Sequence, residues 1–294
     1  MRHQKLRDAA SAYALILPAL LLFGVFMLYP FLRNFDLALY RTAPYPGLPS
    51  RWAGLSQFTS VITSSTFIHS LISTLLYTVM VVPVGVVLGL VLAVAAHQKL
   101  RGMGFYRVIF STTAVSSVAV AALVFGTFLN PVNGLLPSIG INPNPPILQS
   151  PTDALPAMAV IGVWQFVGLS FILFSAALQS LPEEVLEASL VDGASPVRRF
   201  WGVTVPLLSP MIFYVVAIGT ISALYTFGQM DLLIGPGAST YTNTETLSYL
   251  IYQDVVVSPN QGVAACAAIA LFVLTALITF AQFRFLEKRV HYGN

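Results

Sequence analysis

The stretch SLPEEVLEASLVDGASPVRRFWGVTVPLLSP, residues 180–210, gathers four carboxylates and two arginines between two long apolar runs. Charged residues make up only 9% of the 294-residue chain. A chain with so few charges has therefore concentrated a set of them in one place. This pattern is typical of a surface that docks onto another molecule.

The composition around this stretch indicates a membrane protein. Hydrophobic residues make up 56% of the chain and its mean hydropathy is +0.80, whereas soluble domains carry about 25% charged residues. A bilayer core of roughly 30 Å is crossed by about 20 apolar helical residues. Six such runs, without Lys or Arg in their interiors, cover residues 13–32, 71–96, 108–129, 154–179, 206–233 and 262–283. The sequence thus predicts one all-α polytopic domain, residues 1–294, with six transmembrane helices.

Positively charged residues predict how this domain is oriented. Eleven Lys and Arg residues lie in the termini and in the segments on the same side of the membrane, and the alternate loops hold only Arg33, Arg41 and Arg51. Cytoplasmic segments carry such an excess in membrane proteins. Both termini and residues 180–205 are therefore predicted to face the cytoplasm. The net charge of +3 reflects this topology, and no nucleic-acid partner is expected.

The charged stretch itself predicts two short helices. Ser180 followed by Glu183 is a capping-box pattern, and Pro182 suits a first helical turn. Gly193 supplies a natural stop, after which Ser195-Pro196 restarts a helix. The product is a cytoplasmic hairpin of two helices at an angle.

Two environments suit this hairpin. It could lie on lipid headgroups, with Arg198 and Arg199 towards phosphates, or it could insert into a partner protein. An anionic inner leaflet would repel Glu183, Glu184 and Glu187, while a protein groove can pair them. The carboxylates therefore favour the partner protein.

The spacing within the hairpin resembles a known motif. Glu187-Ala188-Ser189, Asp192-Gly193-Ala194, Phe200, Val203 and Val205-Pro206 are similar to the EAA loop of membrane subunits in binding-protein-dependent ABC importers. That pattern reads E-A-A, three residues, G, nine residues, I, one residue, L-P. Ser189 replaces its third small residue, and valines replace its Ile and Leu.

The resemblance covers nearly the whole chain and points to the sugar-type permeases related to the maltose transporter. It is carried by the six spans and by Tyr29-Pro30, Gly104-Phe105-Tyr106-Arg107, Asn130-Pro131 and Thr244-Glu245-Thr246-Leu247. Three further segments resemble the A subunit of importers for glycerol-3-phosphate and glycerophosphodiesters: residues 176–180, 196–200 and 282–287.

This resemblance implies a type I ABC importer permease fold in a bacterial plasma (inner) membrane. It also implies four kinds of partner, namely the lipid bilayer, a second homologous permease subunit, two ATPase subunits and an extracytoplasmic solute-binding protein. ATP and Mg belong to the ATPase subunits, because no G-x-x-x-x-G-K-[ST] motif occurs in this chain. We therefore expect no enzyme activity, no cofactor and no metal site here.

The resemblance also assigns the hairpin to coupling with an ATPase subunit. The candidate coupling residues are Glu183, Glu184, Glu187, Ala188, Asp192, Gly193, Ala194, Arg198 and Phe200. Glu187 would make a charged contact, Gly193 the sharp turn that Asp192 braces, and Phe200 an apolar anchor. Two alternatives stay open: Glu187 as a solvated residue, and Phe200 as ordinary packing against the membrane helices.

Polar residues inside the spans are the candidates for the solute path, since such groups usually face protein or water. At 100° per residue, four of them in the fifth run fall within an arc of about 80°: Tyr214, Ser222, Tyr225 and Gln229. A similar arc in the fourth run holds Gln165, Gly168, Ser175 and Gln179. Asp231, near the outer end of the fifth run, could reach water, pair with an external arginine, or contact a cationic part of a solute such as choline. The alternative for both arcs is helix packing by small and polar residues.

The sequence constrains the identity of the solute less than it constrains the fold. The resemblance implies glycerol-3-phosphate or a glycerophosphodiester such as glycerophosphocholine, yet the absence of Lys and Arg inside the spans favours a neutral sugar or oligosaccharide. An ion-coupled secondary transporter would show intramembrane ionisable residues, which the mid-span regions lack. A membrane-embedded enzyme would need a convergent cluster, but His3, His69, His97 and His291 are scattered.

Overall fold

A computed structural model of the chain describes residues 2–43, 49–97, 102–234, 241–257 and 259–286, although the side chains of residues 2–12, 183, 186, 187, 190, 241, 242 and 286 lie outside this description. The chain divides into two compact units, residues 1–64 with 251–270 and residues 65–250 with 271–294. Each unit is described by itself.

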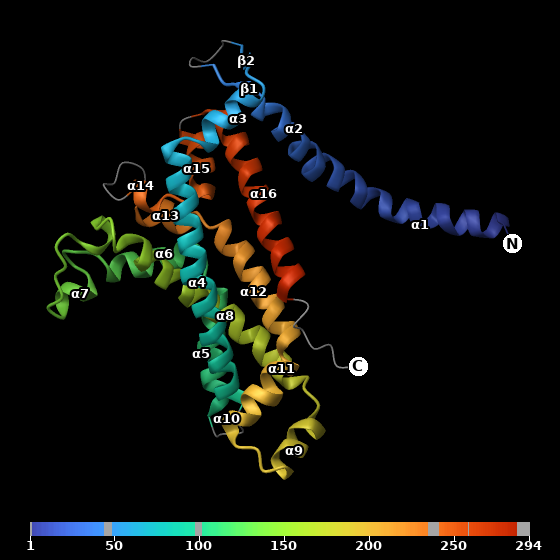
Figure 1. The fold of residues 1–294 in the computed structure, drawn as a ribbon, viewed down its shortest axis with the longest axis vertical. Coiled ribbons are helices and arrows are strands. Elements are labelled where there is room, and N and C mark those ends of the chain that lie inside the picture. Colours follow the sequence, from blue (N-terminus) through green and yellow to red (C-terminus); the bar gives the residue numbers. More distant parts are fainter. Residues whose placement is uncertain (1, 44–48, 98–101, 235–240, 258, 287–294) are drawn as a thin grey trace. The chain divides into compact units, whose positions relative to one another are not determined.

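The first unit contains an apolar helical run and a small ribbon (Figure 1). Its elements are α1 Arg2–Phe23, the π-helix η1 Gly24–Leu28, α2 Tyr29–Ala38, β1 Tyr40–Arg41, β2 Arg51–Trp52, α3 Leu55–Ile62, the π-helix η4 Gln253–Val257 and the first part of α16 Gln261–Leu286. The all-α expectation therefore needs one correction, because β1 and β2 pair antiparallel.

The second unit holds the other helices. They are α4 Ser65–His97, α5 Met103–Val115, α6 Val118–Phe128, α7 Leu135–Ser138, η2 Ile147–Gln149, α8 Ala154–Gln179, α9 Glu183–Val191, α10 Pro196–Arg199, the π-helix η3 Phe200–Thr204, α11 Val205–Leu207, α12 Ser209–Leu224, α13 Gly228–Leu233, α14 Tyr241–Thr244, most of α15 Leu247–Tyr252 and the end of α16.

Small residues bring the central helices of this unit together. α8 packs along α4, and α12 packs against both (Figure 1). A Cβ atom built on Gly89 of α4 would lie 2.4 Å from the Ser170 Cβ of α8. The Phe166 ring lies between two glycines, since a Cβ on Gly85 or on Gly219 would come within 2.4 Å or 2.2 Å of it. Transmembrane helices use such small residues because close backbone approach increases packing between them.

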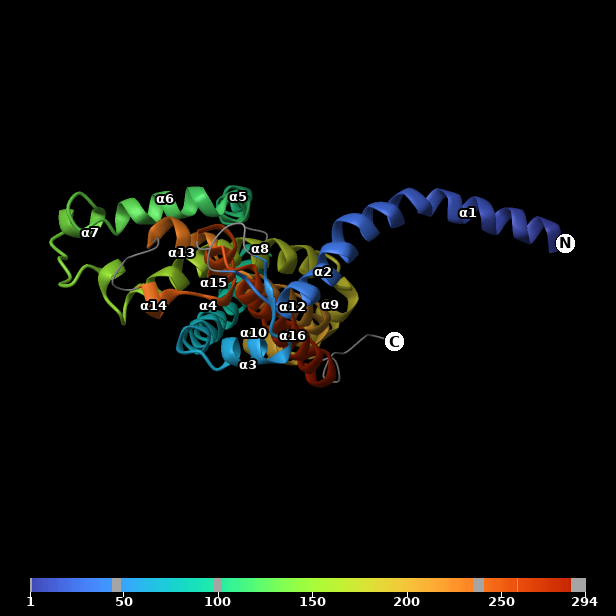
Figure 2. The ribbon, with the colours of Figure 1, turned by 90° about the horizontal axis from the view of Figure 1, so that it is seen from above.

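Two of the six expected spans are not single straight helices. The run at 108–129 is divided into α5 and α6, which are bent by 102°; Figure 2 shows α5 nearly end-on and α6 lengthwise. The bend lies at Ser116 and Ser117, where Ser116 is extended and the Ser117 Oγ accepts a hydrogen bond from the backbone N–H of Val120 (3.2 Å). This N-cap satisfies a donor at the start of the new helix.

The run at 206–233 also differs from the expectation. Residues 196–207 and α12 are bent by 68°, and α12 ends at Leu224 before the separate helix α13. Within the described residues, four helices are long and apolar enough to cross a membrane, and the number is six if each bent pair forms one span. The long ones are Tyr13–Ala38, Ser65–His97, Ala154–Gln179 and Gln261–Phe285.

A buried polar cluster fixes the segment between α14 and α15 to α4. The Glu245 side chain is only 3% exposed and its Oε2 accepts a hydrogen bond from the Ser70 hydroxyl (3.2 Å). The backbone N–H of Leu247 donates to the Thr74 Oγ1 (2.9 Å). The Thr246 hydroxyl donates to the carbonyl of Thr226 (2.8 Å), which lies in the break between α12 and α13. The break therefore leaves this carbonyl paired, as backbone at membrane depth requires.

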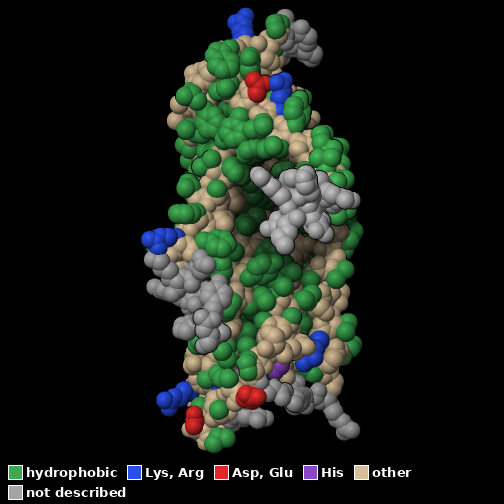
Figure 3. Space-filling view, turned by 90° about the vertical axis from the view of Figure 1, so that its right-hand side faces the viewer, with side chains coloured by type: hydrophobic (Ala, Val, Ile, Leu, Met, Phe, Trp, Pro, Cys, Tyr) green, Lys and Arg blue, Asp and Glu red, His purple; other side chains and the backbone are tan. Residues whose placement is uncertain are grey.

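Much of the outer surface is apolar. Figure 3 shows hydrophobic side chains spread widely over one face, with backbone and other side chains between them, and charged side chains are few on it. Large apolar residues stand out strongly in both units; Leu15 is 82% exposed and Leu123 is 72% exposed. Exposed apolar surface of this extent marks contact with lipid or with other subunits.

Candidate functional site

The charged stretch forms the expected pair of short helices. α9 covers Glu183–Val191, and α10 covers Pro196–Arg199 before the chain continues into η3. The Ser195 Oγ accepts a hydrogen bond from the backbone N–H of Arg198 (3.4 Å) and so caps α10. Capping and proline placement thus explain the second helix from the sequence.

Gly193 makes the turn between these helices. Its φ of +68° lies in the left-handed region, which costs residues with a Cβ about 1–2 kcal/mol. The backbone N–H of Ala194 donates to the carbonyl of Ser189 (3.2 Å), and that of Asp192 donates to the carbonyl of Ala188 (3.0 Å). The bond at Ala194 is the one that a Schellman motif makes at the end of a helix.

The predicted capping box at the start of α9 is wrong. The Ser180 hydroxyl donates to the carbonyl of Ala177 (2.9 Å) and so belongs to the end of α8. α9 begins only at Glu183, so Ser180 lies too far back to be its N-cap. Pro182 remains at the entry to α9, where its carbonyl accepts from the N–H of Val185 (3.3 Å).

The candidate coupling residues lie mostly at the surface. Five of them are exposed: Glu184, Ala188, Asp192, Gly193 and Arg198. Ala194 and Phe200 are half-buried. The side chains of Glu183 and Glu187 lie outside the described residues.

Three exposed apolar residues in and after the hairpin were not among the coupling residues predicted from the sequence. Val191 at the end of α9 is 87% exposed, Val197 is 69% exposed and Trp201 is 66% exposed. The half-buried Phe200 ring packs edge-on against Trp201, with centroids 5.1 Å apart. Trp201 therefore has more free surface than Phe200, the residue expected to act as the apolar anchor. The available signal was an apolar side chain at each end of a charged hairpin.

Two candidate path residues pair with each other. The Gln229 Nε2 of α13 donates to the Gln165 Oε1 of α8 (2.8 Å). The Tyr77 hydroxyl of α4 donates to the Gln229 Oε1 (2.9 Å), and the Gln165 Nε2 donates to the carbonyl of Ser116 (3.3 Å). This polar chain joins α4, α13 and α8 to the bend before α6. Sequence reasoning missed Tyr77 and Ser116, because only the fold brings them to the glutamines.

The other candidate path residues lie apart from this chain of hydrogen bonds. α12 ends at Leu224, so the arc calculated for a continuous helix does not hold for Gln229, which is 2% exposed. Tyr214 and Tyr225 are 50% and 45% exposed, and Ser222 is also exposed. Ser175, whose hydroxyl has no hydrogen-bond partner among the described residues, and Asp231 are half-buried. Gly168 is buried and Gln179 is exposed.

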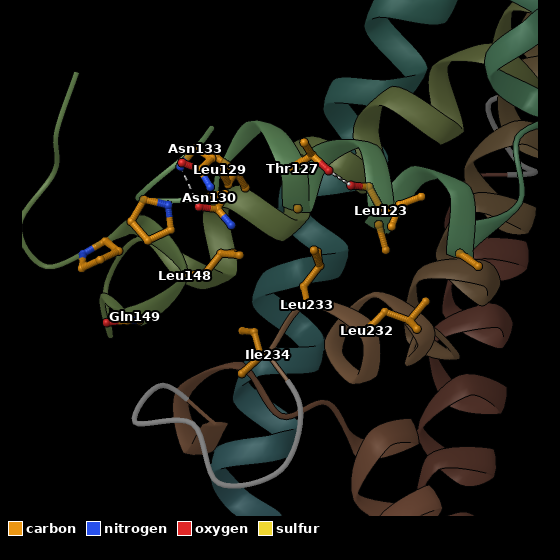
Figure 4. Close-up of a pocket in the computed structure, with 15 residues that line it drawn as sticks. Leu123, Thr127, Leu129, Asn130, Asn133, Leu148, Gln149, Leu232, Leu233 and Ile234 are labelled. Atoms are coloured by element: carbon orange, nitrogen blue, oxygen red, sulfur yellow. Dashed lines mark hydrogen bonds between the residues drawn. The ribbon is translucent and has the colours of Figure 1, made fainter. Parts of the chain in front are cut away.

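A cavity of about 550 Å³ lies beside α6 and α13. Figure 4 shows Leu123 and Thr127 of α6 near Leu232 and Leu233 of α13. The Asn130 side chain closes the adjoining turn, since its Oδ1 accepts from the backbone N–H groups of residues 132 and 133 (2.9 and 3.0 Å). The described lining residues carry amides, a hydroxyl and apolar groups but no charged side chain.

Comparison with known proteins identifies the family. Residues 85–292 match the family described as the binding-protein-dependent transport system inner membrane component. Two similar proteins are both named sn-glycerol-3-phosphate transport system permease protein UgpA. The protein of Agrobacterium fabrum (strain C58) is 34% identical over 286 residues, and that of Rhizobium meliloti (strain 1021) is 32% identical over 286 residues. Each alignment covers 96% of both chains.

Solved structures agree on the fold. A bacterial ABC transporter involved in the import of the acidic polysaccharide alginate matches with a TM-score of 0.85 and 23% identity, covering 98% of this chain and 99% of that one. The family that the EAA-like hairpin indicated is thereby confirmed. The chain belongs to the family of binding-protein-dependent transport system inner membrane components and is a permease subunit of an ABC importer.

Proposed function

We propose that this permease subunit forms half of the path for glycerol-3-phosphate or a glycerophosphodiester and is driven by ATPase subunits that bind its α9–α10 hairpin. This choice of solute is supported by the similarity to relatives named for sn-glycerol-3-phosphate transport, which extends over 96% of each chain. A second permease subunit, two ATPase subunits and an extracytoplasmic solute-binding protein complete the importer.

The proposed orientation places both termini and the hairpin in the cytoplasm. It is supported by the eleven basic residues on that side against three in the alternate loops. ATP and Mg would be bound by the ATPase subunits, since this chain carries no phosphate-binding loop motif. The hairpin then transmits the movement of the ATPases to the membrane helices.

The docking surface that we propose combines charge and apolar anchors. Glu184, Asp192 and Arg198 supply exposed charges, and Val191 and Trp201 supply exposed apolar surface. Buried apolar anchors dominate many protein interfaces, and charges around them set the orientation. Gly193 fixes the angle at which both helices are presented.

The turn can be tested with two glycines of the same segment. Gly193→Ala forces a residue with a Cβ into the left-handed conformation, at a cost of about 1–2 kcal/mol, and should lower ATP-dependent uptake about fivefold or more. Gly202→Ala is the matched control, because Gly202 has no positive φ and neither glycine has an atom within 4 Å of a built Cβ. Equal uptake by both variants in proteoliposomes would contradict the role of the turn.

The structure favours different roles for the path candidates. Gln165 and Gln229 already satisfy each other, so we propose that they hold α8 and α13 together. Tyr214, Ser222 and Tyr225 remain exposed on or just after α12, so we propose that they line the path. Tyrosine and serine hydroxyls both donate and accept hydrogen bonds, which suits a solute that carries hydroxyl groups.

Two substitutions separate these roles. Gln229→Ala removes the acceptor of the buried Tyr77 hydroxyl, which keeps its contact with the Thr226 side chain, and the donor to the Gln165 Oε1. Leaving such groups unpaired costs about 1–3 kcal/mol, so the substitution should lower the thermal unfolding temperature of the purified complex. Tyr225→Ala should leave that temperature unchanged and reduce uptake. The assignment fails if Tyr225→Ala destabilises the complex as much as Gln229→Ala or leaves uptake intact.

The solute is tested by transport. Proteoliposomes with the complete importer and its binding protein should take up radiolabelled sn-glycerol-3-phosphate in an ATP-dependent manner, and unlabelled glycerophosphocholine should compete. A sugar or oligosaccharide is the second candidate, because no Lys or Arg lies in the interior of the predicted spans. ATP-dependent uptake of a sugar without any uptake of the glycerophosphates would establish that alternative.

A further inference from the structure

The β1–β2 ribbon of the first unit places two arginines side by side. Arg41 is directly opposite Arg51 in the antiparallel register, and both side chains are exposed. Like charges at opposite positions destabilise a strand pair. Among the described residues neither forms an ion pair, whereas Arg33 of α2 pairs with Asp36. The ribbon therefore carries two positive charges that no carboxylate of the described residues pairs with.

This ribbon is held against the start of α16. The backbone N–H of Gly262 donates to the Thr42 Oγ1 (3.0 Å). A Cβ on Gly262 would lie 2.2 Å from the carbonyl oxygen of Tyr40. The Cys266 thiol donates to the carbonyl of Ala38 (3.4 Å). These contacts keep Arg41 beside the N-terminus of a 26-residue helix, the end at which a helix favours negative charge.

A polar cavity of about 430 Å³ lies at this position. Arg41 lines it together with Thr42, Gln57, Ser60 and Asn260. Among the described lining residues none is acidic, so the charge that they bring to the cavity is positive. The Thr42 hydroxyl and the Gln57 and Asn260 amides can donate hydrogen bonds to a ligand, whereas the Ser60 hydroxyl already donates to the carbonyl of Gln57 (2.8 Å).

Gln57 adds a second, independent sign of a ligand. Its side chain is 2% exposed, and neither its amide nitrogen nor its amide oxygen has a hydrogen-bond partner in the described part of the chain, apart from a weak contact with the Cys266 thiol. Buried polar groups are normally hydrogen-bonded, because an unpaired one is costly. A buried amide in this state at the edge of a polar cavity is able to hydrogen-bond a polar group that binds there.

The combination of an arginine fork, a helix N-terminus and neutral donors suits an oxyanion. Arginine is favoured for phosphate because its planar group donates two parallel hydrogen bonds. We propose that this cavity binds a phosphate group on the outer side of the membrane, carried by a free glycerophosphate or by the headgroup of a phospholipid. This inference rests on the proposed function in one respect: the proposed orientation of the chain places the cavity on the outer side of the membrane.

The test measures binding rather than transport. The purified importer complex, in a maltoside detergent and a phosphate-free buffer, is titrated calorimetrically with sn-glycerol-3-phosphate, with glycerol as the neutral control and with phosphatidylglycerol in mixed micelles. Phosphate sites on the ATPase subunits contribute equally in every variant. The component of binding that belongs to this cavity should weaken at least tenfold in Arg41→Gln. It should weaken by a smaller factor in Arg41→Lys, which keeps the positive charge but loses the planar fork.

Arg33→Gln is the matched control, because it removes an outer arginine of the same unit that is already paired. Saturable binding that depends on Arg41 and not on Arg33 supports the site, and the probe that shows it identifies the source of the phosphate. Identical curves for the original complex and Arg41→Gln with both probes, at unchanged subunit composition, would overturn the proposal. Failure of glycerol-3-phosphate uptake alone would overturn the proposed solute and leave this site standing.

Discussion

The close contact between α4 and α8 is the interaction on which the second unit depends. Gly85 and Gly89 allow Phe166 and Ser170 to approach the α4 backbone, and Gly219 brings α12 to the other side of the same Phe166 ring. Once these three helices are in place, Gln165 of α8 can accept a hydrogen bond from Gln229 of α13. Packing by small residues thus sets the polar contacts, which in turn hold the broken helices.

The broken helices follow from the need to pair backbone groups away from water. At the end of α12 the carbonyl of Thr226 receives the Thr246 hydroxyl, and at the bend between α5 and α6 the carbonyl of Ser116 receives the Gln165 amide. In both places a side chain from a distant segment replaces a helical hydrogen bond. Helix breaks of this kind can line a path for polar solutes within a membrane subunit.

Much of this arrangement could be predicted from the sequence, because apolar runs and the Gly193 turn depend on local chemistry. The breaks could not be predicted, since apolar composition continues through Ser116 and Thr226 and only distant partners make the breaks favourable. For the same reason the prediction that Gln229 and Tyr225 share one face of a continuous helix was wrong. The exposed Trp201 was overlooked because Phe200, its neighbour, matched the family pattern.

The central claim is that the α9–α10 hairpin of this permease binds an ATPase subunit. The most direct measurement is photocrosslinking from a benzoylphenylalanine placed at Val191, which is 87% exposed, with Ile139, which is 61% exposed, as the control position. The account predicts a covalent product between position 191 and the ATPase subunit, and none from position 139. An ATPase product from position 139, or none from position 191 in an assembled and active complex, would contradict it.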